Sequence, residues 1–491
     1  MANIVFVYND YEHLGTANLL TVVKKHGHQA VYVHYKYEDA FIGDYARVDY
    51  ENIADRVAES HPDLVCFSCV TSNFQSQINA ARACKKRIPE AITLFGGIHP
   101  TIVPERVLKY PEVDGLVMGE GELVFPAFLE MCQHNGWFGL PDQKPPDGVT
   151  FKKNGVVKGH FTMAPMIRNL DALPFPDKTP FYEAMPYSQN EYWIMASRGC
   201  QFKCSYCYAA TRDSPVIKRS PENVIAELQH AIATYHPKSV FFLDDIFTGN
   251  RKWLYHCLEL YKKKIRLPFS CSSYPSSMDL EKAEALKQAG CVYVNLGVQS
   301  ISETTCKEIL NRPTRVHHIR RAIAALNTTR LLSQVDHMLG IPNDPLDVQE
   351  EAMKFYNEVR PTTIQVFHLV YFPRSPITHY ALKEGFLTPE EVDRIEEGLG
   401  NNNTIAVGKG MRSDHIAGVS LVLNWLPVLP RPVVNFLVWS KLYRYLRIRN
   451  LYIAVAIPRL LLSLFHPNYS RGRQYIRRYF QSFFTKDHGQ T

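Results

Sequence analysis

The chain has 491 residues, 46% of them hydrophobic, which is ordinary for a globular protein and enough for two or three domains. Its net charge is +7, and its 11 cysteines form no evenly spaced framework, which argues against a disulfide-rich secreted protein. The first ten residues lack the basic-then-apolar layout of a signal peptide and are typical of a first strand. We therefore expect a cytoplasmic protein with reduced thiols.

Short apolar runs alternate with amphipathic stretches over roughly residues 1–140. Strands are expected at 4–8, 30–34, 64–70, 92–95 and 115–118, with helices between them, for example over 14–26 and 75–87. This alternation predicts a doubly wound parallel sheet, whose ligands bind beyond the carboxyl ends of the strands. The expected strand ends are polar or glycine-rich, at 9–10, 68–73, 96–101 and 119–122. These features alone favour a nucleotide-like ligand or a flavodoxin-like regulatory domain.

A proline-rich linker is expected over roughly residues 141–189. Within it, the segments 148–152 and 156–161 flank Lys153-Asn154-Gly155. Asn-Gly between two extended segments is a strong β-hairpin signal. The stretch 170–176, which contains two prolines, is expected to be an extended connector.

Strand and helix patterns alternate again over roughly residues 190–390. Six strands are expected, at 193–196, 239–243, 268–272, 292–296, 334–339 and 364–368. Six such units fit a partial (β/α)6 barrel, and barrel active sites lie at the carboxyl ends of the strands. Two adjacent carboxylates, Asp244 and Asp245, follow the second strand, where they would repel each other without a cation. Helix capping by Asp245 is the alternative.

Three cysteines, Cys200, Cys204 and Cys207, lie just after the first strand of this central region, with C-x3-C-x2-C spacing. Three thiolates can hold three irons of a [4Fe–4S] cube and leave the fourth iron open, as in a catalytic metal site. Zinc usually needs a second Cys/His pair, and the next cysteine is distant. The spacing therefore favours a catalytic iron–sulfur cluster.

With Tyr206 as its aromatic position, this motif resembles the cluster-binding signature of radical S-adenosylmethionine (SAM) enzymes. The upstream segments 96–101 and 118–122 resemble the cobalamin-binding domain of B12-dependent members of that family. The resemblance implies three cofactors: a [4Fe–4S] cluster on the three cysteines, SAM and cobalamin. It assigns SAM contacts to Tyr206, Asp244, Asp245, Gln299 and Ser300. It assigns cobalamin contacts to Ser68, Thr71, Gly96, Gly97, His99, Thr101, Gly119, Glu120 and Gly121.

The chain departs from the family pattern at three places. Asp10 and His13 lack the D-x-H-x-x-G spacing of a cobalt-ligating histidine, so we expect His13 at a helix start and cobalamin without a protein histidine below the metal. Gln299 stands where the family usually has glutamate, and it is neutral. The stretch 272–275 lacks the arginine of many relatives, and Ser273 or Tyr274 is expected to substitute for it.

The C-terminal region, roughly 391–491, is expected to be mostly helical and changes character after Asp414. Its apolar runs, 416–429 and 451–465, are shorter than the roughly 20 residues of a spanning helix. Basic and aromatic residues are interleaved there, and no Asp or Glu occurs between Asp414 and Asp487. This pattern indicates an interfacial membrane segment, with a helical cap on the barrel as the alternative. The aliphatic runs argue against nucleic acid.

The resemblance implies a cobalamin-dependent radical SAM enzyme that methylates an unactivated carbon, here in an apolar or lipid-like substrate. A tetrapyrrole cyclase resembling the magnesium-protoporphyrin ester enzyme is the alternative. RNA methylthiolation would need three further cluster cysteines upstream, and a non-catalytic B12 sensor would not need the three cysteines. The expected partners are an electron donor such as flavodoxin or ferredoxin and a membrane surface. No general base is identifiable.

Overall fold

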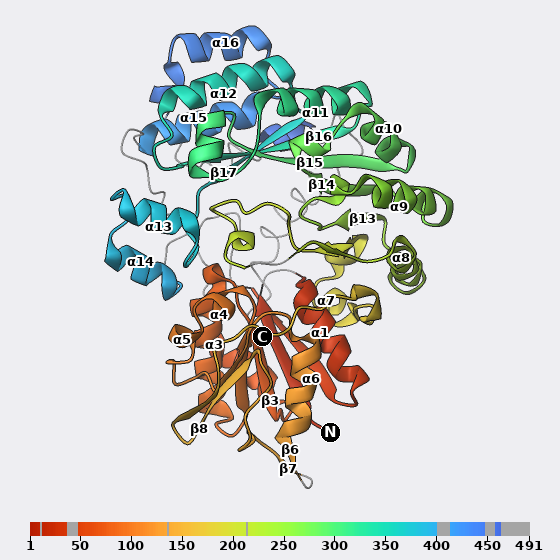
Figure 1. Cartoon of the computed structure of the whole chain (residues 1–491), viewed down its shortest axis with the longest axis vertical. Helices are drawn as coiled ribbons and strands as arrows, with labels where there is room; N and C mark the ends of the chain where they lie inside the picture. The colour runs from red at the N-terminus through yellow and green to blue at the C-terminus, as the bar shows by residue number, and fades with distance from the viewer. Residues whose placement is uncertain are drawn as a thin grey trace, which may run out of the picture.

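The computed structural model describes residues 1–9, 12–36, 48–134, 137–212, 215–399, 413–446 and 457–462. Two sheets dominate these residues (Figure 1). The N-terminal sheet with its helices forms the lower body in red and orange, and the second sheet forms the upper body in green and blue. The expected α/β architecture is confirmed, including the helical C-terminal region.

The N-terminal sheet has the strand order β2-β1-β3-β4-β5 in its parallel part. All five expected strands are present: β1 (Asn3–Asn9), β2 (Gln29–Tyr35), β3 (Leu64–Ser68), β4 (Ile92–Gly96) and β5 (Gly115–Val117). Alternate side chains of β1 enter two different cores, Phe6 with Phe125 and Val7 with Ile78. One core is covered by α1 (Leu14–Lys25) and α6 (Gly121–Cys132), the other by α2 (Tyr50–Ala58) and α3 (Phe74–Arg87). The sheet is therefore doubly wound, as predicted.

The expected hairpin is present as β8 (Val149–Lys153) and β9 (Val156–Gly159). Asn154 and Gly155 have φ values of 51° and 75°, the left-handed pair that a tight hairpin turn needs. The hairpin is more than a linker feature, because β8 pairs antiparallel with β5 and extends the first sheet. The other short elements before the barrel are α4 (Ile98–Ile102), α5 (Pro104–Val107), β6 (Gln133–His134), β7 (Trp137–Phe138) and α7 (Thr179–Ala184).

The second sheet contains six parallel strands in chain order, which confirms the expected partial barrel. They are β10 (Glu191–Ile194), β13 (Ser239–Phe242), β14 (Phe269–Ser273), β15 (Cys291–Gln299), β16 (Leu332–Leu339) and β17 (Thr363–His368). Between them run α8 (Pro221–Tyr235), α9 (Arg251–Lys264), α10 (Leu280–Gln288), α11 (Val316–Thr328) and α12 (Leu346–Val359). Two short antiparallel strands, β11 (Ser197–Arg198) and β12 (Ile217–Lys218), enclose the cysteine segment.

The barrel is followed by α13 (Pro376–Lys383), α14 (Pro389–Glu396), α15 (Ser413–Trp425) and α16 (Arg431–Trp439). Helix α15 is part of the barrel core, since Val419 and Leu423 have no exposed surface. Arg360 holds its end by donating to the carbonyls of Leu426 and Leu429, at 2.5 and 2.9 Å. For the run 416–429 the structure therefore supports the helical cap, and most of the run 451–465 lies outside the described residues. No helix in the described part of the chain combines the length and apolar character needed to cross a bilayer.

A buried ion pair joins the two bodies. The Oε1 atom of Glu12 lies 2.7 Å from Nζ of Lys178, and neither side chain is exposed beyond 2%. The Lys178 ammonium also donates to the carbonyl of Trp193 in β10 and lies 3.7 Å from the ring centroid of Tyr192. One linker lysine is thereby bound to both the first body and the barrel.

We predict that Glu12→Gln destabilises the protein by about 3–5 kcal/mol, because it leaves the Lys178 ammonium buried without its counter-charge. Urea unfolding followed by circular dichroism measures the effect. Lys263→Met, which removes the exposed Lys263–Glu259 pair on α9, is the matched control and should leave the midpoint nearly unchanged. Equal midpoints for the two variants would contradict the structural role given to Glu12.

Candidate functional site

The segment between β11 and β12 positions the three cysteines. Cys204 is buried, and Cys200 and Cys207 are half-buried. The segment is fixed from the far side by the residues that follow β15. Ser205 donates from its backbone N–H to the carbonyl of Leu310 at 2.9 Å and from its hydroxyl to the carbonyl of Ile309 at 2.7 Å. The position of the thiols therefore depends on a segment about a hundred residues further along the chain.

The three thiols occupy one region of the molecule. Burial first, and then the neighbouring charges of Asp245, Cys204 and Cys207, raise the pKa of Cys200 to about 11, although a hydrogen bond from the Phe202 backbone opposes the shift. Burial is also the main cause that raises the pKa of Cys207. No three Cys, His, Asp or Glu side chains converge on a single metal ion in the ranges that the structure describes. A four-iron cube binds each thiolate at a different corner and stabilises it as the anion, so this donor set fits a cluster.

Arg312 is a site residue that sequence reasoning missed. Its Nη1 donates to Sγ of Cys204 at 3.3 Å and to the hydroxyl of Tyr206 at 3.2 Å, and its Nη2 donates to the carbonyl of Gly297. The guanidinium lies over the ring of Tyr274, 4.4 Å from its centroid. The positive charge of Arg312 thus lies beside Cys204 and Tyr206 of the cysteine motif. It also lies over Tyr274, which is in the stretch 272–275 that lacks the arginine of many relatives.

The two adjacent carboxylates have different surroundings. Asp244 is buried, and its oxygens accept from the backbone N–H of Ala196 at 3.0 Å and from the hydroxyl of Ser197. It therefore fixes the backbone that leads into the cysteine segment. Asp245 remains accessible beside the thiols, and its pKa is raised first by loss of hydration and then by Asp244, while Arg212 lowers it. Asn250, not Asp245, caps α9.

The other expected SAM residues lie at the end of β15. Gln299 has a φ of 71°, which lies in the left-handed region that is strained for any residue other than glycine. It stands where the pairing of β15 with β16 is irregular. Strained backbone of this kind is frequent at ligand sites. Ser300 is fully buried, and its hydroxyl accepts from the backbone N–H of Ser302 at 3.2 Å, so its side chain serves the turn. Whether these side chains contact SAM stays a prediction.

The polar ends of the first sheet form one connected set of loops. Gly97 has a φ of 96°, and a Cβ there would lie 2.7 Å from the carbonyl oxygen of Cys69. Thr101 links two of the loops, since its hydroxyl donates to the carbonyl of Gly97 at 2.7 Å and accepts from the N–H of Gly119 at 3.0 Å. Only glycine fits position 97, where the loops meet.

Two histidines near these loops are structural in the geometry observed. His13 caps α1 by accepting from the N–H of Thr16 at 3.1 Å, which confirms the helix-start prediction. His99 has no exposed surface, packs on Phe74 and lies 3.2 Å from the hydroxyl of Thr71 through its Nδ1. Burial lowers the pKa of His99 to about 3, so the ring is neutral. His99 and Thr71 support the loop from beneath its surface.

A mostly apolar cavity opens at the carboxyl ends of β3 and β4, between α1 and α6. It is lined by Phe6, Thr16, Leu19, Cys66, Phe67, Ser68, Leu94, Phe95, Gly96, Gly97, Val117 and Phe125. Three residues expected to contact cobalamin, Ser68, Gly96 and Gly97, are in this set. A cavity with bare backbone at its rim and aromatic walls fits a large cofactor that inserts an apolar group.

Ion pairs hold the first sheet's loops against the cysteine segment. Arg198, two residues before Cys200, lies 2.6 Å from Oε1 of Glu122 and 3.5 Å from Oε1 of Glu120. Burial alone would lower the pKa of Arg198, but Glu122 and then Glu120 raise it above its usual value. Glu120 also accepts from the N–H of Ile167 at 2.7 Å. Glu120, which was expected to contact cobalamin, thus links the loop that follows β5 to the cysteine segment.

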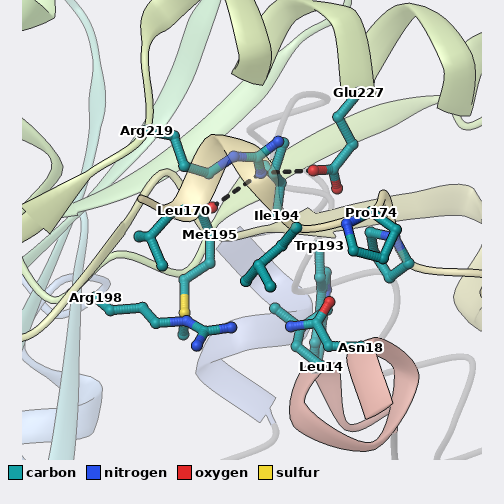
Figure 2. A pocket seen from close by; sticks show the side chains of 12 residues that line it. Leu14, Asn18, Leu170, Pro174, Trp193, Ile194, Met195, Arg198, Arg219 and Glu227 are labelled. Atoms are coloured by element: carbon teal, nitrogen blue, oxygen red, sulfur yellow. Dashed lines mark hydrogen bonds and ion pairs between the residues drawn. The ribbon is translucent and has the colours of Figure 1, made fainter. Parts of the chain in front are cut away.

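A small pocket at the junction of the two bodies is shown in Figure 2. Leu14 and Asn18 of α1 approach Trp193 and Met195 of the barrel there. Its charged residues are already paired, because Arg219 lies 2.5 Å from Glu227 and Arg198 is bound to Glu122. The pocket is therefore a seam between the two bodies whose charged residues are paired within the chain.

The structure combines a doubly wound N-terminal sheet with a partial barrel, and ion pairs join the loops of that sheet to the three-cysteine segment of the barrel. This combination is that of radical SAM enzymes with a B12-binding domain. Two family models agree with this class. The B12 binding domain model matches residues 2–129, and the Radical SAM superfamily model matches residues 194–356. The chain belongs to the radical SAM enzymes that have a cobalamin-binding domain.

Among curated proteins, the chain is 25% identical over 386 residues to an uncharacterized methyltransferase of Pyrococcus horikoshii, covering 76% of this chain and 79% of that one. It is 24% identical over 399 residues to the anaerobic magnesium-protoporphyrin IX monomethyl ester cyclase of Cereibacter sphaeroides, of which it spans only 63%.

Two solved structures share the fold. The radical SAM methyltransferase TsrM from Kitasatospora setae, solved with cobalamin and a [4Fe-4S] cluster, matches with a TM-score of 0.62 and 16% identity over 78% of both chains. The cobalamin-dependent radical SAM enzyme OxsB matches with a TM-score of 0.66 and 13% identity, over 99% of this chain and 76% of that chain.

We predict that Cys200→Ala, Cys204→Ala and Cys207→Ala each lose most of the roughly four irons per chain that a reconstituted cluster supplies. Iron and sulfide analysis together with the visible absorbance of the cluster measures the loss. Cys257→Ala, a buried thiol on α9, is the control and should keep the cluster. Full iron in any of the three variants would overturn that ligand.

Gly97→Ala should abolish retention of cobalamin, because its methyl group meets the backbone of Cys69 and shifts the loop. Gly155→Ala is the matched control, since Gly155 also has a positive φ but nothing within 4 Å of its would-be Cβ. Cobalamin absorbance after gel filtration compares the two. Equal retention would argue against the loop at Gly97 as the cobalamin site.

Proposed function

We propose that this protein is a cobalamin-dependent radical SAM methyltransferase that methylates an unactivated carbon of a largely apolar small molecule. The observation that carries the proposal is the pairing of Arg198 with Glu122 and Glu120. It brings the loop that follows β5 to within one ion pair of the cluster cysteines. Methyl transfer to a carbon radical needs both cofactors at one substrate, and this arrangement supplies that proximity.

The proposed cofactor sites follow from the residues described above. Cys200, Cys204 and Cys207 would hold the cluster, and the loops around Gly97 and Gly119 would hold cobalamin. When bound, the cluster with SAM supplies a radical that takes hydrogen from carbon, and cobalamin supplies the methyl group. The chain itself contributes position, charge and exclusion of water.

We assign different tasks to the two carboxylates. Asp245 is accessible beside the thiols, so it is placed to bind the ammonium group of SAM. Asp244 is already bound to Ala196 and Ser197, so it keeps the cysteine segment in position. Arg312 holds Tyr206 beside Cys204 by donating to both side chains.

The substrate would lie against the concave face of the barrel sheet. Asn295, Gln334 and Asp336 share this face, because Asn295 donates to Asp336 at 2.9 Å and Gln334 donates to Asp336 at 2.7 Å. The alternate residues Val294 and Val335 are buried toward the helices.

Apolar side chains are exposed at the carboxyl ends of the two edge strands of this sheet, β10 and β17. Met195 is 38% exposed, Phe367 44% and Val370 40%. A polar row deep in the barrel with apolar side chains at its mouth suits a molecule with an apolar body and one hydrogen-bonding end.

A second candidate is oxidative cyclisation, since the cyclase of Cereibacter sphaeroides is among the relatives. The two reactions differ in mass change. Methylation adds one methyl group and converts a second SAM to S-adenosylhomocysteine, whereas cyclisation adds no methyl group.

The test is an anaerobic assay of the full chain reconstituted with iron, sulfide and cobalamin. It receives SAM, reduced flavodoxin or ferredoxin, and an extract of lipids and other apolar metabolites. We expect 5′-deoxyadenosine, S-adenosylhomocysteine and a product heavier by one methyl group. 5′-Deoxyadenosine without any methylated product would reject the methyltransferase and leave the cyclase.

Asp245→Asn should weaken SAM binding by about tenfold to a hundredfold while the iron content stays unchanged, because it removes a charge-assisted hydrogen bond to the ammonium. Asp244→Asn should instead lower the thermal midpoint, since it alters a buried acceptor of two hydrogen bonds. Equilibrium dialysis with SAM and calorimetry separate the two effects. The reverse pattern would exchange the roles of the two residues.

A further inference from the structure

Helix α16 has an apolar face turned to solvent. Its inner side chains Val434 and Val438 are buried against the barrel. On the opposite side, Val433 is 41% exposed, Phe436 53% and Trp439 79%. Spacing of three residues places these side chains on one helix face, and the rings of Phe436 and Trp439 lie 6.1 Å apart.

Large apolar and aromatic side chains are also exposed just after the helix. In the turn Leu442–Tyr445, Leu442 is 45% exposed and Tyr445 is 79% exposed. Tyr443 between them points inward and donates to Glu350 of α12. We call Val433, Phe436, Trp439, Leu442 and Tyr445 the outer face. Val434 and Val438 on the inner side of α16 already pack against the barrel, so the residues of the outer face are not needed to hold the helix there.

The charge next to the outer face is positive. Arg431 at the start of α16 and Lys441 just beyond its end are both exposed. The sequence contains no Asp or Glu from 415 to 486, whereas Lys and Arg recur throughout that stretch. Glu358 and Glu350 of α12 lie near Arg431 and Lys441, but the C-terminal segment itself adds charge of one sign only, which is complementary to an anionic surface.

We propose that the outer face docks the protein on the surface of a membrane that contains anionic lipids. Trp and Tyr favour the level of the lipid headgroups, Phe and Leu enter the acyl boundary, and Lys and Arg meet the phosphates. The helix has nine residues, so it lies in the interface and does not span. Docking extends the proposed function by placing the enzyme where apolar substrates concentrate.

The position of α16 permits docking without covering the cofactor loops. It packs on α12 at the top of the barrel in Figure 1, and the N-terminal sheet lies at the opposite end. Asn357 of α12 fixes this arrangement by donating to the carbonyl of Arg431 at 3.1 Å and to Asn435 at 2.7 Å. The two bodies and their seam therefore remain free while the outer face meets lipid.

The test is co-sedimentation of the full chain with vesicles of phosphatidylcholine alone or with added phosphatidylglycerol. We expect binding to the anionic vesicles that weakens at high salt. The double variant Phe436→Ser/Trp439→Ser should bind at least about tenfold more weakly, because two interfacial aromatic anchors are removed. Phe161→Ser is the matched control, because Phe161 is 46% exposed on the other body, and it should bind as the unchanged chain does.

Circular dichroism and iron content show that the double variant is folded, and its cleavage of SAM in solution should be unchanged. That readout separates failure of docking from failure of the proposed reaction. Absence of binding by the unchanged chain, or equal binding by the double variant, would overturn the proposal. So would a dimer of the unchanged chain that becomes a monomer in the double variant without any lipid binding, since the outer face would then join two copies.

Discussion

The contact between the Gly119 loop and the cysteine segment depends first on one ion pair, Arg198 with Glu122. Each sheet alone carries loops at the carboxyl ends of its strands, but a reaction that uses two cofactors needs these loops to face each other. Arg198 lies two residues before Cys200, and Glu122 lies in the first turn of α6, just after the Gly119 loop. Because both side chains are mostly buried, the pair is shielded from salt and fixes orientation as well as distance.

Two further joints support that pair from opposite sides, and they differ in kind. On one side, the Glu12–Lys178 pair is fully buried and removing one partner is costly. On the other side, Arg106 of α5 lies 2.6 Å from Asp393 and 3.2 Å from Glu397 at α14, where the carboxylates are partly exposed. Exposed pairs are weak individually and are screened by salt. The joint at the linker is thus a single buried pair, whereas the joint at α14 is a network of ion pairs that also includes Glu396 and Arg374.

Local signals in the sequence were sufficient for the elements and for the cofactor motif. Asn154-Gly155 predicted the hairpin because two residues decide the type of its turn. His13 predicted a helix start because its side chain caps a helix that begins at the next residue. Arg312 could not be found in this way, because its contact with Cys204 joins segments 108 positions apart. The run 416–429 was ambiguous, since an apolar helix has the same composition against a barrel as on a membrane, and only packing decides.

Gln299, where the family usually has glutamate, lies close to Arg312. The Nη2 atom of Arg312 and the Nε2 atom of Gln299 lie 3.1 and 3.4 Å from the point where a Cβ on Gly297 would stand. A carboxylate at position 299 would therefore compete for the guanidinium, which now bonds to Cys204, Tyr206 and the Gly297 carbonyl. A neutral amide leaves the positive charge of Arg312 directed at the cluster cysteine. The neutral side chain at position 299 is thus compatible with the cation at Arg312, and Asp245 is the negative group that acts on Cys200.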